Sequence, residues 1–181
     1  FLVVGIPSTD VFAPKTIQFI ADQTEKLESL NEIEEVVSLS NADDLIGSNS
    51  DFIVQPLLEI TPETVTEQEH LRKRAQANSL ISKTLLNDDS TATLFFIRPN
   101  SQPDNPQFDE QLVSKVEQIF NLETPPWPNY EFHMAGWLVT DVNLSRSMNR
   151  DMIVFMPLTY LLVIVLVSLA LRNCWAVILA I

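Results

Sequence analysis

The sequence predicts an α+β domain followed by membrane-spanning helices, and two observations carry that prediction. All 24 acidic residues lie at or before Asp151, in a region where apolar segments of strand and helix length alternate with polar ones. The residues after Asp151 carry one charge, at Arg172, and form a nearly continuous apolar stretch. Because the chain begins at Phe1 and ends at Ile181 inside that stretch, we interpret it as part of a longer protein.

The first strand–helix–strand unit is predicted within residues 1–39. Residues 1–8, FLVVGIPS, are apolar and β-branched, as is typical of a strand. Pro14 suits the first turn of a helix over residues 14–30. Apolar and small residues recur there at helical spacing and predict a buried face of Ile17, Ile20, Thr24 and Leu27. Residues 33–39, IEEVVSL, predict the next strand, reached by a right-handed crossover.

The middle of the chain is expected to be an insertion. Residues 40–63 are rich in turn-forming residues and are expected to be irregular. Residues 64–78 predict a polar helix, in which Thr64 and Glu67 have the spacing of a capping box. The following segment, TLLNDDSTATLFFIRP, predicts two strands around the turn Asn87–Ser90.

The second half of the domain repeats the pattern of the first. Residues 91–98 predict the more regular of those two strands, and residues 107–122 predict an amphipathic helix with Leu112, Val113, Val116, Ile119 and Phe120 inward. Residues 130–135 alternate as a strand. With residues 40–90 set aside as the insertion, the order is βαββαβ. This is the ferredoxin-like pattern, in which two helices cover one face of a four-stranded sheet.

The membrane segment is predicted over residues 152–171, which contain no charged residue. A helix of this length spans about 30 Å, the thickness of the hydrocarbon core of a bilayer. Thirteen of these residues are Leu, Ile, Val or Phe, and they favour insertion by about 4 to 8 kcal/mol. A buried helix of a soluble protein is the alternative, but such a helix usually has a polar face. Residues 174–181 resemble the start of a further, truncated span.

Orientation and the course of the helix follow from single residues. Arg172, in the short turn between the two spans, favours the cytoplasmic side, so residues 1–151 are expected in the periplasm or outside the cell. Arg146 and Arg150 compete with this assignment from the other side. Pro157 lies early in the span and is expected to remove one backbone hydrogen bond there.

The junction between the domain and the span is predicted to transmit motion. The domain, residues 1–136, ends at Gly136, where the backbone can turn sharply. A linker helix over residues 137–151 follows and is expected to continue into the span. Trp137 is expected to anchor the boundary with the membrane. We regard Gly136, Trp137, Asp151, Pro157 and Arg172 as the candidates for structural coupling.

Composition and motifs exclude several functions. Residues 1–151 contain ten cationic and 24 anionic residues, a net charge of −14 that repels nucleic acids. His70 and His133 lack the spacing of a metal site. The acidic segments NADD (41–44) and NDDS (87–90) are interpreted as solvated turns rather than calcium loops. The cationic RKR cluster at residues 72–74 is expected to pair with Glu67 and Glu69.

Catalysis is not indicated by any motif. The sequence contains no phosphate-binding loop, dinucleotide fingerprint, Cys-x-x-Cys pair or nucleophile elbow. We therefore assign no catalytic residue and expect no cofactor. A membrane-anchored enzyme remains the weakest of the function classes considered.

Four segments of the chain are similar, in the same order, to segments of one known family. VFAPKTIQFIADQTEKLESLNEIEEVVSLSNADDL is similar to the start of the first extracytoplasmic domain, with Val37, Ser38, Leu39 and Asn41 matching a V-x-S-L-x-N strand. LISKTLLNDDSTATLFFI is similar to a segment in which LIS precedes an acidic turn. HMAGWLVTDVNLSRSMNRDM resembles a strand that ends in Gly and a linker helix with an Asp before the second membrane helix, and LALRN resembles the basic turn after it. By their order and spacing, these segments resemble the RND superfamily of transporters, in its MMPL and Patched-like branch.

The resemblance implies a proton-driven exporter or translocator of lipids or other hydrophobic substrates, with twelve membrane helices. The chain would hold the first porter domain, the second membrane helix and the start of the third, within a region often called a sterol-sensing domain. The proton-relay carboxylates of the family lie in later helices, so none is assigned here. Expected partners are membrane lipids and a hydrophobic substrate, and a homo-oligomer is compatible with the architecture. The alternative is a receptor of the same architecture that senses lipid or sterol without transport.

Overall fold

The computed structural model describes residues 1–48, 51–58, 61–62, 64–100, 105, 107–122 and 131–171. Within them the chain is mixed α+β and divides into two units, Phe1–Thr140 and Asp141–Ile181. The elements follow in the order β1 (Leu2–Pro7), α1 (Pro14–Glu28), β2 (Ile33–Val37), β3 (Asp43–Ser48), β4 (Asp51–Pro56), α2 (Val65–Ala77), α3 (Ser79–Thr84), β5 (Ala92–Pro99), α4 (Phe108–Leu122), β6 (His133–Gly136) and α5 (Trp137–Leu171).

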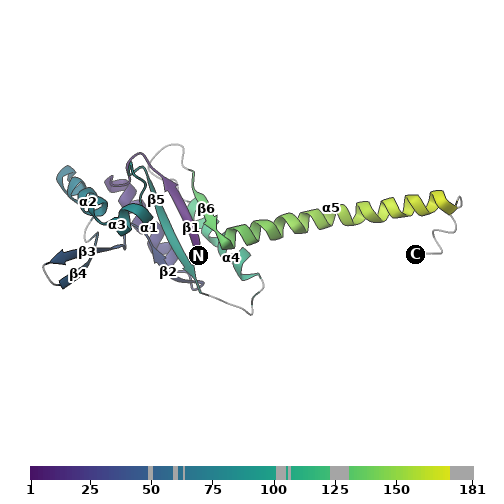
Figure 1. Cartoon of the computed structure of the whole chain (residues 1–181), viewed down its shortest axis with the longest axis horizontal. Coiled ribbons are helices and arrows are strands. Elements are labelled where there is room, and N and C mark those ends of the chain that lie inside the picture. Colours follow the sequence, from purple (N-terminus) through teal and green to yellow (C-terminus); the bar gives the residue numbers. More distant parts are fainter. Residues whose placement is uncertain are drawn as a thin grey trace. The chain divides into compact units, whose positions relative to one another are not determined.

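The main sheet has four strands in the order β2-β5-β1-β6, and all of its pairs are antiparallel (Figure 1). The first strand of the chain, β1, is therefore central. Leu2 lies opposite Ile97 of β5 on one side and opposite Gly136 of β6 on the other. Strands β2 and β6 form the two edges of this sheet.

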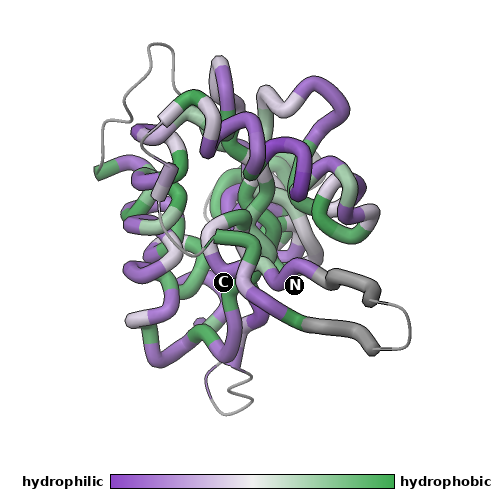
Figure 2. The backbone as a smooth tube through the Cα atoms, turned by 90° about the vertical axis from the view of Figure 1, so that its left-hand side faces the viewer, coloured by the Kyte–Doolittle hydropathy of each residue, from purple (hydrophilic) through white to green (hydrophobic). Residues whose placement is uncertain are grey.

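The core lies between the sheet and helices α1 and α4, which contact each other (Figure 1). Alternate residues of β1 are buried, as are Thr93, Phe95 and Ile97 of β5. The rings of Phe95 and Phe120 meet edge to face, with centroids 5.5 Å apart. Each fully buried apolar side chain stabilises the fold by about 1.5 to 3 kcal/mol. Figure 2 shows apolar segments gathered in the middle of this unit.

The two core helices have nearly the faces that the sequence predicts. On α1 the four predicted residues, Ile17, Ile20, Thr24 and Leu27, are buried. On α4 the buried residues are Phe108, Leu112, Val113, Val116 and Phe120. Ile119, predicted to point inward, is half-buried, and Phe108 takes a core position that was not predicted.

The prediction that residues 40–63 are irregular is wrong. Strands β3 and β4 pair antiparallel in a separate two-stranded sheet, from Asp43 opposite Pro56 to Ser48 opposite Asp51. The apolar runs of these two strands are short, and the many turn-forming residues of the segment led to the prediction of an irregular structure. Strand pairing supplies partners for the backbone groups of both runs, which isolated segments would leave to water.

The prediction of a strand before Asn87 is also wrong. Of the three residues before Asn87, Thr84 ends α3, Leu85 is its C-cap, and only Leu86 makes an isolated bridge, to Thr93 of β5. The helix begins at Asn78, whose side-chain oxygen accepts hydrogen bonds from the backbone N–H groups of Leu80 and Ile81. This cap stabilises a helix start in a segment whose apolar residues also suit a strand. The second strand of the predicted pair is β5.

Helix α2 begins with the predicted capping box. Thr64 Oγ1 accepts from the Glu67 backbone N–H, and the Glu67 carboxylate accepts from the Thr64 backbone N–H. The predicted pairing of the cationic cluster with Glu67 and Glu69 is correct only in part. Arg72 lies 3.7 Å from Glu69, but its shorter ion pair, at 2.8 Å, is with Asp10 in the segment after β1.

Arg74 corrects the interpretation of NADD as a solvated turn. Its Nε donates to Asp44 Oδ2 at 3.0 Å, and Asn78 Nδ2 donates to Asp44 Oδ1 at 3.2 Å. Asp44 is buried, so these two donors replace the water that its carboxylate loses. Helix α2 is thereby tied to strand β3. In the other acidic segment, residues 87–90, the first three residues are exposed as predicted, but Ser90 is buried.

The predicted linker helix and the described part of the predicted span are one continuous helix, α5. It is long and apolar enough to cross a membrane. Its large apolar side chains from Met152 to Leu166 are 41–68% exposed. The described residues of this chain leave these side chains uncovered.

Candidate functional site

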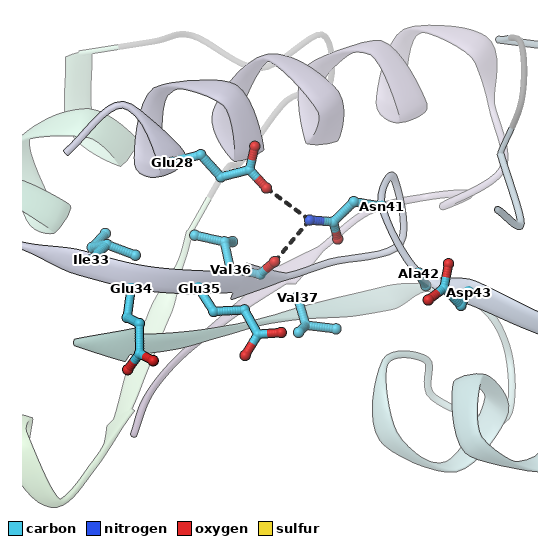
Figure 3. A pocket seen from close by; sticks show the side chains of 9 residues that line it. All are labelled: Glu28, Ile33, Glu34, Glu35, Val36, Val37, Asn41, Ala42 and Asp43. Carbon is cyan, nitrogen blue, oxygen red and sulfur yellow. Dashed lines mark hydrogen bonds between the residues drawn. The ribbon is translucent and has the colours of Figure 1, made fainter. Parts of the chain in front are cut away.

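A groove with a volume of about 370 Å³ runs along the free edge of β2. It is lined by Glu28, Ile33–Val37 and Asn41–Asp43. Figure 3 shows Glu28 and Asn41 on one side of the β2 ribbon and Glu34, Glu35 and Val37 on the other. The groove thus follows the edge of the sheet rather than entering the core.

Asn41 is the central polar residue of this groove. Its Nδ2 donates to the backbone carbonyl of Val36 at 2.7 Å and to Glu28 Oε1 at 2.9 Å (Figure 3). Its Oδ1 accepts from the backbone N–H of Ser38 at 2.8 Å and from Ser38 Oγ at 3.4 Å. An amide has two donors and two acceptor positions, so all of its hydrogen-bonding capacity is used.

A buried hydroxyl cluster holds the turn that carries Asn41. Ser38 Oγ lies 2.8 Å from Thr24 Oγ1 of α1 and 2.8 Å from Ser40 Oγ. Thr24 donates to the Ile20 carbonyl at 2.7 Å, and Ser40 donates to Thr24 at 3.0 Å. The chain therefore leaves β2 at Val37, two residues before the predicted end of the strand, because Ser38 and Ser40 turn back toward α1.

The carboxylates of the groove are partly neutralised. Arg98 on β5 pairs with Glu34 at 3.1 Å and with Glu35 at 2.9 Å. All three side chains are about half exposed, so solvent weakens these pairs. Near the start of β2, Lys115 of α4 donates to Glu32, and this hydrogen bond lowers the pKa of the Glu32 carboxyl below its ordinary value of 4.5.

This arrangement can bind or exclude a partner but contains no catalytic pairing. Its hydroxyl groups hydrogen-bond to one another and to backbone groups, without a neighbouring histidine. Among the described residues no group of three His, Cys, Asp or Glu side chains could hold a metal ion. His70 lies on helix α2, and His133 lies on strand β6.

The predicted coupling residues lie at the other edge of the sheet and along α5. Gly136 is the last residue of β6 and has a φ of +120°, and a Cβ atom there would lie 2.5 Å from the Phe1 carbonyl oxygen. Only glycine fits this backbone without strain. Trp137 begins α5 and is 74% exposed.

The remaining coupling candidates do not gather into a site. Asp151 and Pro157 both lie within α5, and Asp151 is exposed. Thr159, near Pro157, donates its hydroxyl to the Phe155 carbonyl at 2.8 Å. Arg172 and residues 174–181 lie outside the described residues.

Asn41 is the residue that sequence reasoning undervalued. The sequence places it in the acidic segment at residues 41–44 and predicts no structural role for it. Its signal was a strand followed by Ser, Ser and Asn within four positions, since these side chains bond to neighbouring backbone groups. Neither a known family model nor a curated protein matches this chain.

Proposed function

We propose that this chain is part of a polytopic RND-type transporter of the MMPL and Patched-like branch, which exports or translocates lipids or other hydrophobic substrates. The observation that carries the proposal is α5, which is continuous from the end of β6 and whose apolar side chains are exposed on all sides over Met152–Leu166. Exposed apolar surface of this extent is stable in lipid and unstable in water.

The proposed domain is ferredoxin-like. The strand order β2-β5-β1-β6, with every pair antiparallel and with α1 and α4 as the two crossovers, supports this assignment. The β3–β4 hairpin, α2 and α3 are then the insertion between the second and third strands of the pattern. Because the groove at β2 has no catalytic pairing, the domain is proposed to guide or gate a substrate rather than to transform it.

The location follows from the same proposal. Residues 152–171 span the cell membrane, or the inner membrane where a cell has two, and residues 1–151 lie on the periplasmic or outer side. Proton coupling would reside in membrane helices other than α5, since Met152–Leu171 contains no ionisable acid. Residues 137–151 then connect the sheet to the span without a loop.

A deletion of the gene tests transport. We expect cells without the protein to retain lipids or hydrophobic compounds that wild-type cells export, and the full-length gene to restore export. Unchanged lipid composition and unchanged efflux would overturn the proposal. Lipid binding by the purified protein, with no effect of the deletion on efflux, would favour the sensor instead.

An insertion tests whether helix continuity matters for transport. Gly-Ser-Gly-Ser placed between Asn149 and Met152 interrupts α5, because glycine and serine disfavour a helix interior. We expect membrane integration and a folded domain but no export. Four alanines at the same place are the control for length, since they preserve the helix. Full export by the Gly-Ser variant would contradict coupling through α5.

A further inference from the structure

The free edge of β2 is of the kind that ordinarily pairs with another strand. An edge strand presents unpaired backbone N–H and C=O groups that pair readily with a second chain. Strand β2 is at the end of the sheet order, and the groove of Figure 3 leaves its free side open. The structure nevertheless fills part of this edge from within the chain.

The Asn41 amide occupies the position of a neighbouring peptide group. In a strand, the carbonyl of one residue and the N–H two residues later point toward the same neighbour. Asn41 bonds this pair, taking the Val36 carbonyl with Nδ2 and the Ser38 N–H with Oδ1. We propose that the Asn41 side chain closes the β2 edge and prevents strand pairing with a second copy of this chain.

The amide is held firmly enough to act in this way. Glu28 of α1 accepts its second N–H, and Ser38 Oγ lies on its oxygen side. Reversing the amide would set its oxygen against the Glu28 carboxylate and the Val36 carbonyl, and its NH₂ group against the Ser38 N–H. The buried bonds among Thr24, Ser38 and Ser40 fix the turn from the other side.

Two other features of β2 act in the same direction but more weakly. A register shift between Ile33 and Glu35 makes the strand irregular, which discourages pairing. Glu34 and Glu35 would approach the same residues of a second copy in an antiparallel pair, where like charges repel. Both carboxylates already bind Arg98, which reduces this repulsion. The hydrogen bonds of Asn41 are therefore the decisive barrier.

Substitution of Asn41 tests the closure in the full chain, solubilised in detergent micelles because of α5. We expect Asn41→Ala to strengthen self-association about thirtyfold, the change that two hydrogen bonds of ordinary net strength produce. Light scattering measures the association. Hydrogen exchange should show the Ser38 amide unprotected at low protein concentration and protected at high concentration.

Two further variants separate edge closure from a loss of stability. Asn87→Ala removes a side chain that accepts from the backbone N–H groups of Thr91 and Ala92 in an exposed turn, so it should leave association unchanged. Asn41→Leu keeps the branched shape of the Asn41 side chain without its polar atoms, and it should also self-associate more strongly than the wild type, which provides the test if the alanine variant fails to fold.

Each outcome decides the question. Association equal to wild type in the folded Asn41 variants would overturn the closure. Association in which the Ser38 amide stays unprotected at every concentration would also overturn it, because another surface would then be responsible. Association of the Asn87→Ala variant as strong as that of Asn41→Ala would assign the effect to general destabilisation and overturn the closure. Transport is not involved in any of these measurements, so the closure and the transporter proposal fail or stand separately.

Discussion

Helices α4 and α5 draw on the same apolar residue types but arrange them differently. On α4, Leu112, Val116 and Phe120 are buried on one face while Asp109 and Glu117 occupy other positions. On α5, apolar residues from Met152 to Leu166 surround the helix and are exposed on every side. The periodicity of apolar residues, rather than their number, therefore distinguishes a helix suited to a water–core boundary from one suited to lipid.

Truncation in the core of the domain gives the largest expected effect. Phe120→Ala removes a fully buried ring that meets Phe95 and should lower the free energy of unfolding by about 3 to 5 kcal/mol. Leu122→Ala, on the same helix but 82% exposed, should change it by less than about 0.5 kcal/mol. Chemical unfolding followed by circular dichroism measures both. Similar effects of the two changes would contradict the single buried face of α4.

A charge in α5 tests the other side of the comparison. Leu162→Arg should make membrane insertion less favourable by about 2.5 to 3.5 kcal/mol, because a cation at the centre of a span is poorly solvated. The fraction of protein that resists alkaline extraction from membranes measures this, with Leu162→Val as the control. Unfolding of the Phe1–Thr140 unit should not change. Full integration of the arginine variant would oppose a lipid environment for α5.

Gly136 is the last residue of β6, and α5 begins directly after it. Gly136→Ala would set a Cβ atom 2.5 Å from the Phe1 carbonyl oxygen at a φ of +120° and should cost about 1 to 3 kcal/mol of domain stability. Gly5→Ala is the matched control, since its Cβ atom would meet the Leu94 side chain at 3.2 Å and that side chain can shift. Equal losses in thermal unfolding would show that the turn after β6 tolerates an ordinary residue.

The smallest expected effect concerns the exposed side of α4. The pKa of Glu32 is lowered by Lys115, so the contribution of this pair is present above pH 4.5 and is lost as pH falls through the lowered pKa. Lys115→Met should flatten the pH dependence of unfolding below pH 4.5, by less than about 1 kcal/mol because both groups contact solvent. Lys83→Met on α3 is the control and should leave the pH dependence of unfolding unchanged. An unchanged pH profile in Lys115→Met would contradict the role of this pair.

Local patterns predicted the elements that depend on nearby residues. The buried face of α1, the capping box at Thr64 and the strand β5 all follow from spacing within a few positions. The contact between Arg74 and Asp44 joins residues 30 positions apart, and no local pattern reveals such a partner. The same limit explains the missed β3–β4 hairpin, whose strands are stabilised by each other rather than by their own composition.

The groove along β2 was also predictable only in part. Its carboxylates were visible in the sequence as part of an acidic domain. Their pairing with Arg98 was not, because it depends on the register of β2 against β5. Asn41 was visible as one residue of a motif, but its value depends on β2 being an edge strand. That fact follows from the order of strands in the sheet, which the sequence of elements alone does not give.

Because β1 is central in the sheet, it cannot pair with its neighbours until most of the domain has been synthesised. Its neighbours are β5 and β6, and Leu2 pairs with residue 136, near the far end of the domain. A growing chain therefore carries an apolar strand without either neighbour until β5 has been made, and it cannot complete its sheet until Gly136 has been made. Helix α5 follows soon afterward. If α5 spans the membrane as proposed, completion of the domain and insertion of α5 fall close together in time, and β1 needs protection from other chains until then.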